Sequence, residues 1–397
     1  MNTEIRRDAR EVLVNETTGR TIWWIAGRGR EETHTYYDIC PWSPDGRHIL
    51  FSSADPGLLR VIGEQVNLET DAGQLCICDT ESWDVEVIAE HLLFSSGGGV
   101  RAMWGADGSV YFCPDNDTLA VMELPSREVL RTMPQVATML SPDGTQFAAT
   151  LEDPDAPSNG HSTGAFTMNA DGTDVRRIAS TRELYEITPN KADFLLEHMR
   201  LGHTKWSPDS SHVMVAMWGV LGQGAGSRVR RSLYVMRRDG SEQRWLCYFG
   251  GHHIWSPDGS QILFAESRTW EERGTGETRL FLVNADGSDK HMVVDHQLGG
   301  HPIIDPAGAT IVTETRTTTM PVMATGLCRV DIQSQTVEDL VVFERPFDMG
   351  KYHTRGQVTP PGRYTHPHAV FNRDGSQLLY SSAETGTSQI YILPLEG

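Results

Sequence analysis

Short apolar runs recur along the chain, and each follows a turn motif of the form x-S-P-D-G. HILFSS (48–53) and QILFAES (261–267) show the pattern of a half-buried β-strand. The residue that opens the motif is aromatic or aliphatic, as at the end of a short preceding strand. Pro presets φ, Asp caps the turn and Gly accepts φ > 0, so the motif predicts a β-hairpin.

Seven copies of this hairpin follow one another through the sequence. They are WSPDGRHILFSS (42–53), WGADGSVYFC (104–113), LSPDGTQFAAT (140–150), WSPDSSHVMVAM (206–217), WSPDGSQILFAES (255–267), IDPAGATIVTET (304–315) and FNRDGSQLLYSS (371–382). A weaker strand–turn–strand repeat lies between some of them: FTMNADGTDVRRI (166–178), LYVMRRDGSEQRWL (233–246), LFLVNADGSDKHMVV (280–294) and CRVDIQSQTVEDLVV (328–342). Two hairpins make a four-stranded sheet, so the sequence predicts an all-β fold, a seven-bladed β-propeller.

The two ends of the sequence fit a closed propeller. RTIWWIAG (20–27) precedes the first repeat as a lone strand, and SQIYILPLEG (388–397) supplies the third strand of the last blade. We expect the N-terminal strand to complete that blade and to remove an open sheet edge. The blades use the whole chain, which predicts a single domain over residues 1–397. Longer connections fall around 54–75, 151–165, 181–200 and 343–365, where function often resides in a rigid scaffold.

Composition narrows the choice of partners and compartment. The formal net charge of −19 disfavours nucleic acid and anionic membranes, although an acidic protein can still hold a small anion in a locally positive pocket. No apolar run is long enough to predict a membrane span, and the charged N-terminal sequence MNTEIRRDAREVLVNE lacks the apolar core of a secretory signal. Six scattered cysteines indicate reduced, mostly buried thiols and a cytoplasmic protein.

Histidines recur at one position of the repeat. Three residues before the residue that opens each motif lie Ile39, Arg101 and Ala137 in the first three blades, and then His203, His252, His301 and His368. His366 stands two residues before His368 in THPH. A single histidine before a strand is more often an ordinary loop residue than a ligand. Four at one register converge around a propeller axis, which favours a divalent metal or proton transfer.

Other motifs leave alternatives open. GHSTG (160–164) matches a nucleophile elbow in letters but lacks the strand–turn–helix setting, so we interpret it as a loop. GSRVRRS (226–232) is either a solvated hairpin end or an arginine site for a carboxylate, through Arg228, Arg230 or Arg231. Tyr36 and Tyr37 are either ordinary strand aromatics or a platform for a sugar ring, and Trp218, which precedes a glycine-rich stretch, is expected to bind substrate.

The WSPDG repeats resemble TolB-type propellers. GHTKWSP, GHHIWSPDG, GGHPIIDPAG and YTHPHAVFNRDGSQLLYSS, in this order and followed by SQIYI, are similar to the oligogalacturonate lyase family along essentially the whole chain. That resemblance implies β-elimination of short pectin fragments with a bound manganese ion. It implies His301, His366 and His368 as metal ligands, His252 as the catalytic base and Arg231 as the arginine that binds substrate. His203 would contact substrate at the same mouth.

The sequence departs from the family pattern at two places. Arg363 stands where the family has a glutamine ligand. This loss either weakens or removes the Mn²⁺ held by the three histidines, or leaves water or Gln357 in the fourth place, and Arg363 would bind substrate. WGVLGQGAG (218–226) replaces an acidic, histidine-bearing loop, which bears on the sugar and linkage that fit.

Two functions follow from these residues. The first is a metal-assisted carbon–oxygen lyase that acts on small acidic oligosaccharides and yields 4,5-unsaturated uronates. The alternative is a non-catalytic TolB-like propeller that binds a protein or a glycan, for which the histidines would be dispensable. The sugar, the linkage and the oligomeric state stay open.

Overall fold

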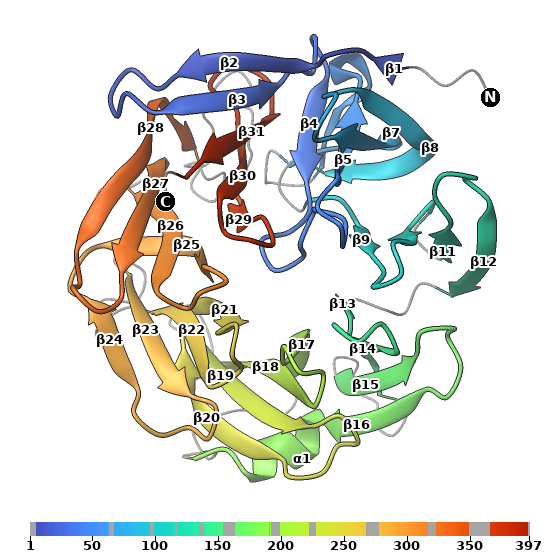
Figure 1. Cartoon of the computed structure of the whole chain (residues 1–397). Coiled ribbons are helices and arrows are strands. Elements are labelled where there is room, and N and C mark those ends of the chain that lie inside the picture. The colour runs from blue at the N-terminus through green and yellow to red at the C-terminus, as the bar shows by residue number, and fades with distance from the viewer. Residues whose placement is uncertain are drawn as a thin grey trace. The chain divides into compact units, whose positions relative to one another are not determined.

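The computed structural model describes residues 5–62, 67–95, 99–115, 118–134, 139–153, 163–189, 191, 199–221, 228–266, 278–316, 323–348 and 366–395. Its strands form seven antiparallel sheets that follow one another along the chain, which confirms the predicted seven-bladed β-propeller (Figure 1). No helix in the described part of the chain has the length and apolar character needed to span a membrane.

The chain divides into two compact units, each described by itself below. The first comprises Met1–Thr132, Ser267–Arg279 and Val294–Gly397, and the second comprises Met133–Glu266 and Leu280–Val293. The prediction of one domain over residues 1–397 therefore stays a prediction.

Blades 1, 2, 6 and 7 belong essentially to the first unit. In spatial order, blade 1 contains β1 (Ile5–Arg6), β8 (Val85–Ser95), β7 (Asn67–Asp79), β5 (His48–Ala54) and β4 (Glu31–His34), with β6 (Arg60–Ile62) paired to β7. Blade 2 contains β12 (Val129–Pro134), β11 (Thr118–Met122), β10 (Val110–Phe112) and β9 (Ala102–Trp104). Blade 6 contains β25 (Leu298–Ile304), β26 (Thr310–Arg316), β27 (Met323–Asp331) and β28 (Val337–Asp348). Blade 7 contains β2 (Arg10–Val14), β3 (Thr21–Ile25), β31 (Gln389–Pro394), β30 (Gln377–Ser382) and β29 (Val370–Phe371).

Blades 3, 4 and 5 belong essentially to the second unit. Blade 3 contains β13 (Met139–Leu140), β14 (Gln146–Glu152), β15 (Thr163–Asn169) and β16 (Arg176–Ser180). Blade 4 contains β17 (Arg200–Trp206), β18 (His212–Leu221), β19 (Arg228–Arg237) and β20 (Arg244–Phe249). Blade 5 contains β21 (Gly251–Trp255), β22 (Gln261–Glu266), β23 (Arg279–Asn284) and β24 (His291–Val294). Two short helices, η1 (Pro56–Leu58) and α1 (Thr181–Glu186), lie in connections.

The N-terminal strand closes the last blade as predicted. β3 pairs with β31 through Trp23↔Ile392, Trp24↔Tyr391 and Ile25↔Ile390. Two further strands at this end were not predicted: β2 adds a fifth strand to blade 7, and β1 pairs with β8 of blade 1. Part of the longer connection around 54–75 is also strand, because β7 extends from residue 67.

The tryptophan that opens the motif links each of three blades to the preceding blade. The indole Nε1 of Trp104 donates to the carbonyl oxygen of Pro41 at 2.8 Å, and that of Trp206 donates to Met139 at 3.2 Å. Trp255 donates to Lys205 at 3.5 Å. Each acceptor directly precedes the opening residue of the preceding blade's motif, so the conserved spacing of the repeat also sets the contact between neighbouring blades.

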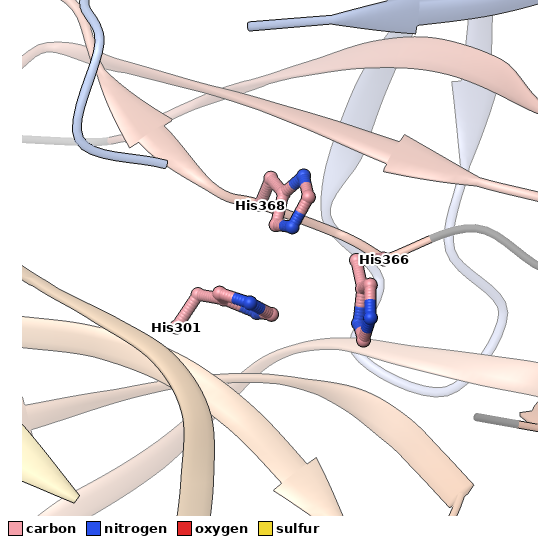
Figure 2. Close-up of side chains that lie close together, drawn as sticks. All are labelled: His301, His366 and His368. Carbon is pink, nitrogen blue, oxygen red and sulfur yellow. The ribbon is translucent and has the colours of Figure 1, made fainter. Parts of the chain in front are cut away.

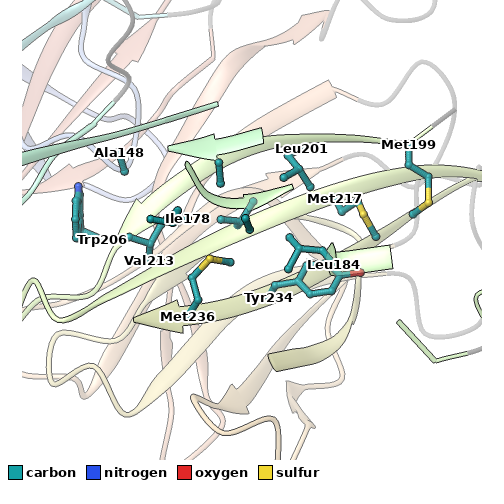
Figure 3. Packing of buried hydrophobic residues seen from close by; sticks show 13 residues of the cluster. Ala148, Ile178, Leu184, Met199, Leu201, Trp206, Val213, Met217, Tyr234 and Met236 are labelled. Carbon is teal, nitrogen blue, oxygen red and sulfur yellow. The ribbon is translucent and has the colours of Figure 1, made fainter. Parts of the chain in front are cut away.

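Figure 3 shows the apolar core between blades 3 and 4 of the second unit. Leu184 of α1 is fully buried in it, next to Met199 and Tyr234. The helix begins with a capping box, in which Ser180 and Glu183 satisfy each other's backbone N–H groups. The strands present alternate side chains to this core. Burial of apolar surface of this kind is the main contribution that stabilises the fold.

Candidate functional site

A β-bulge carries the histidines of blades 4 and 5. In blade 4, Gly202 pairs with Ala216 and Lys205 with Met214, so two residues of β17 oppose one residue of β18. Blade 5 repeats this between Gly251 and Ile254. A bulge of this kind re-aims a side chain, and it commonly lies beside functional sites.

The first residue of each bulge adopts a left-handed backbone. The φ angles are +49° at His203 and +50° at His252, and His368, before β29, has a similar φ of +44°. Such angles are uncommon outside glycine, although histidine tolerates them better than most residues. The conformation recurs in three blades, so it is a built feature of the repeat.

In blade 6, His301 keeps its place three residues before the opening residue, but the backbone of the bulge differs. There Gly300 has the left-handed backbone, with φ of +77°, and His301 follows it. Gly299 pairs with Glu314 and Ile303 with Val312, so three residues of β25 oppose one residue of β26. His203, His252 and His368 therefore share the left-handed backbone, whereas His301 follows the left-handed residue because this bulge is one residue longer.

His301, His366 and His368 form a cluster in the first unit. Each offers one ring nitrogen, and these nitrogens lie within 4.8 Å of one another. Figure 2 shows the three imidazoles around a common space, with His301 from β25 and the other two from the segment before β29. Their ring centroids are 4.3 to 5.1 Å apart. Three converging imidazoles suit a divalent transition metal, so the residues expected as metal ligands fit that role.

One of the three rings is fixed by a carboxylate. Nδ1 of His301 lies 2.9 Å from Oε1 of Glu314, and both side chains are only 2% exposed. A carboxylate accepts, so the Nδ1–H donates to it and Nε2 is the nitrogen left for a ligand. Glu314 is not among the site residues predicted from the sequence.

Two tyrosines line the histidine cluster. The Tyr36 ring contacts His368 and His301 edge-on, at centroid distances of 4.7 and 5.4 Å, and Tyr37 lies 5.1 Å from His301. The last residue pair between β4 and β5 is His34↔Phe51, and the tyrosines follow it in the connection to Trp42. Tyr36 is partly exposed, whereas Tyr37 is buried and burial raises its pKa. Tyr36 is therefore the tyrosine of this pair that a ligand could reach.

His34 is buried behind this cluster. Its Nε2 lies 3.3 Å from the carbonyl oxygen of Pro367, the residue between His366 and His368. Burial lowers the pKa of His34 to about 4, so the ring is neutral at pH 7 and donates from Nε2. It thereby holds the backbone of the HPH segment.

In the second unit, Arg231 adjoins the bulge that carries His252. Its Nη1 donates to the carbonyl oxygen of Gly250, and a Cβ added to Gly251 would lie 3.4 Å from that nitrogen. His252 is half-buried two residues further on. Of the three arginines that the sequence left open, the structure describes only the side chain of Arg231.

His203 rests on a tryptophan. The Trp218 ring lies 5.2 Å from the His203 ring and packs over Gly202, where a Cβ would lie 2.3 Å from it. Arg200 lies against the same indole, with its guanidinium carbon 5.9 Å from a ring centroid. Trp218 thus supports an exposed His203, and glycine precedes that histidine because the ring occupies the space.

His253 differs from His252 in its surroundings. It is 2% exposed, its Nε2 lies 3.3 Å from the carbonyl oxygen of His203, and its ring packs edge-on against Phe249. The buried Lys205 donates to the carbonyl oxygen of His253 at 2.6 Å. Burial, with Lys205 next in effect, holds the pKa of His253 well below its usual range. These contacts join the bulges of blades 4 and 5, which gives His253 a structural role.

Several sequence-based expectations lie outside the described residues. Arg363 and Gln357 are among them, as are most of GHSTG and of the loop after Trp218. The expected roles of Arg363 in substrate binding and of Gln357 as a replacement ligand stay predictions.

Neither a protein-family model nor a curated protein matches the sequence. Two solved oligogalacturonate lyases share its fold. One, in complex with manganese, has a TM-score of 0.70 at 14% identity and covers 99% of this chain and 98% of its own. The other, from Vibrio parahaemolyticus, has a TM-score of 0.72 at 14% identity and covers 100% of this chain and 99% of its own. The expected likeness to this family is confirmed at the level of the fold.

Proposed function

We propose that the protein is a metal-dependent lyase that cleaves short uronic-acid oligosaccharides by β-elimination. The observation that carries the proposal is the convergence of His301, His366 and His368 on a fold shared, over its whole length, with two oligogalacturonate lyases. One of those lyases is a manganese complex, which supports Mn²⁺ as the first metal to test.

The reaction needs a base, a neutralised carboxylate and a protonated leaving group. The base takes the proton at C5, next to the carboxylate, and that electron pair forms the C4=C5 double bond as the C4–O bond breaks. The leaving oxygen then receives a proton. A divalent metal, when bound, supplies positive charge that stabilises the developing enolate.

The chain's own residues divide these tasks in the proposal. His252 removes the proton, as an imidazole can near neutral pH. Arg231 binds a carboxylate, His203 and Arg363 contact the substrate, and Tyr36 offers an aromatic face to a sugar ring. Trp218 already packs against Gly202 and His203, so its role in substrate binding acts through His203.

The location and the substrate remain parts of this proposal. The six free cysteines support a reducing, cytoplasmic compartment. The net charge of −19 disfavours nucleic acid and an anionic membrane as partners, and a small acidic oligosaccharide needs only a locally positive pocket.

The test is an ultraviolet assay for the unsaturated uronate, with a panel of oligouronides and Mn²⁺ supplied. We expect product from the unaltered protein and a loss of at least about 100-fold in His252→Ala, the size of one general-base contribution. His291→Ala, which removes a half-exposed histidine of β24, is the matched control and should keep full activity. If no uronide gives product, the lyase proposal is wrong.

Metal content distinguishes the lyase from the alternative, a non-catalytic propeller. The lyase proposal expects about one bound divalent ion, lost in His366→Ala/His368→Ala. A propeller that merely binds a protein or a glycan has no need of that ion, so an unaltered partner affinity in the double variant would favour it.

A further inference from the structure

Glu314 occupies a position at which the other six blades have a small residue. The position lies three residues beyond the partner of the residue that opens each motif; for example, Trp255 pairs with Ile262 and Ile304 with Ile311. The residues there are Ser52, Cys113, Thr150, Ala216, Ala265, Glu314 and Ser381. Blade 6 thus places a carboxylate where its sister blades have a hydroxyl, a thiol or a methyl group.

The backbone of blade 6 is adapted to this carboxylate. In blades 4 and 5 the equivalent alanines pair with the glycine directly before the histidine, whereas Glu314 pairs with Gly299, two residues before His301. The additional residue in the bulge is Gly300, which has the left-handed backbone. His301 therefore follows the left-handed residue, and its Nδ1 lies at hydrogen-bond distance from the carboxylate, at 2.9 Å.

A buried carboxyl group needs a hydrogen-bond partner, and the Nδ1–H of His301 provides one. Glu314 is 1% exposed as a residue, and burying a polar group that deep costs free energy unless it is hydrogen-bonded. A histidine that ligates a metal through one nitrogen usually donates its other N–H to a carboxylate, carbonyl or water. That contact fixes the tautomer and the ring and makes the ligating nitrogen more basic.

We propose that Glu314 is a positioning residue that orients His301 for a divalent cation and supplies the negative charge that the three neutral imidazoles lack. This inference rests on the proposed function for the presence of a metal. It goes further by naming a residue that none of the histidine motifs contains. With Glu314, a site of three neutral imidazoles and a divalent ion has a net charge of +1 instead of +2.

The variants separate orientation from charge. Glu314→Ala introduces the residue that blades 4 and 5 carry and removes both contributions. Glu314→Gln keeps an acceptor for the Nδ1–H but removes the charge, and Glu314→Asp keeps the charge on a shorter side chain. Glu32→Gln is the control, since Glu32 is equally buried in the same unit and bonds to Arg6 instead of a histidine of the cluster.

The readouts are independent of lyase activity. Binding of Mn²⁺ and Co²⁺ to the metal-free protein is measured by calorimetry, and the tautomer of His301 by nitrogen NMR of the imidazoles. We expect Glu314→Ala to weaken metal binding by about 10- to 100-fold, with a smaller loss in Glu314→Gln and partial rescue in Glu314→Asp. The His301 spectrum of Glu314→Ala should lose its pure Nδ1–H form, and Glu32→Gln should change neither readout.

Each outcome decides something. Equal metal affinity in the unaltered protein and Glu314→Ala overturns the role of Glu314 and leaves the proposed lyase standing. If Glu314→Ala does not fold, Glu314→Gln takes its place. Unaltered metal affinity and an unaltered His301 tautomer in Glu314→Gln would then overturn the inference in the same way. If the unaltered protein binds neither ion, both this inference and the proposed bound metal are wrong. The uronide assay then tests the lyase activity separately.

Discussion

The packing of Trp218 against Gly202 and His203 can be tested by adding one methyl group at each of two equivalent glycines. Gly202 and Gly251 both precede the histidine of a bulge, in β17 and β21. A Cβ at Gly202 would lie 2.3 and 2.6 Å from two carbon atoms of the Trp218 ring, whereas at Gly251 the nearest atom is Nη1 of Arg231, at 3.4 Å. The first distance is a clash and the second an ordinary contact.

The two substitutions to alanine should therefore differ in sign. Neither glycine has a positive φ, so alanine gains about 0.4 to 1 kcal/mol by restricting the unfolded chain. Overpacking costs about 1 to 3 kcal/mol where a rigid ring must move. We expect Gly202→Ala to destabilise the protein by about 1 to 2 kcal/mol, and Gly251→Ala to be neutral or slightly stabilising.

Thermal and urea unfolding measure this difference. For a unit of about 150 residues, 1 kcal/mol corresponds to roughly 2 to 4 °C in Tm, so Gly202→Ala should melt at least about 2 °C lower than Gly251→Ala. Gly202→Ala/Trp218→Leu removes the rigid ring and should recover part of the loss. Equal melting temperatures for the two single variants would refute the proposed packing of Trp218 on Gly202.

Three further predictions concern buried ionisable groups. Arg6 donates to Glu32 at 2.5 Å, so Arg6→Met should cost about 3 to 5 kcal/mol at pH 7 and Arg6→Met/Glu32→Gln much less; burial raises the pKa of Glu32 above 4.5, so urea titrations should show this cost shrinking as the pH falls toward 4.5. Because the pKa of His34 is lowered from 6.5 to about 4, unfolding free energy should fall by about 3 kcal/mol from pH 6.5 to 4, and a His34→Gln variant with an unchanged slope would contradict this. Burial raises the thiol pKa of Cys247 and Cys328 to about 12, so a thiol reagent at pH 8 should label both only after unfolding, and rapid labelling of the native protein would count against their burial.

Much of the scaffold could be predicted because its signals are local. A turn of Pro, Asp and Gly, an apolar strand and an opening tryptophan are each specified within about ten residues of sequence. Closure by the strand around Trp23 also followed from counting strands at the two ends. β2 was not predicted because it pairs with another strand along one edge only. Its Val12 and Val14 are 62% exposed, so the hydrophobic pattern shows no buried face there.

The candidate site was only partly predictable. Counting from the repeat selected the histidines, and the cluster of His301, His366 and His368 was among the expected groups. The count could not show that Gly300 replaces His301 at the left-handed position, because the length of a bulge depends on the pairing of two strands. Glu314 left one signal in the sequence, as the sole acidic residue at a position that is otherwise small.

The sequence by itself determined the number of blades, their closure and the histidines worth following, since each depends on short-range pattern and spacing. Only the tertiary structure decided that Glu314 holds His301, that Arg231 bonds the backbone beside His252 and that Trp218 fills the space over Gly202. Those contacts join residues 13 to 19 positions apart through strand register and side-chain direction, and neither is set until the strands pair.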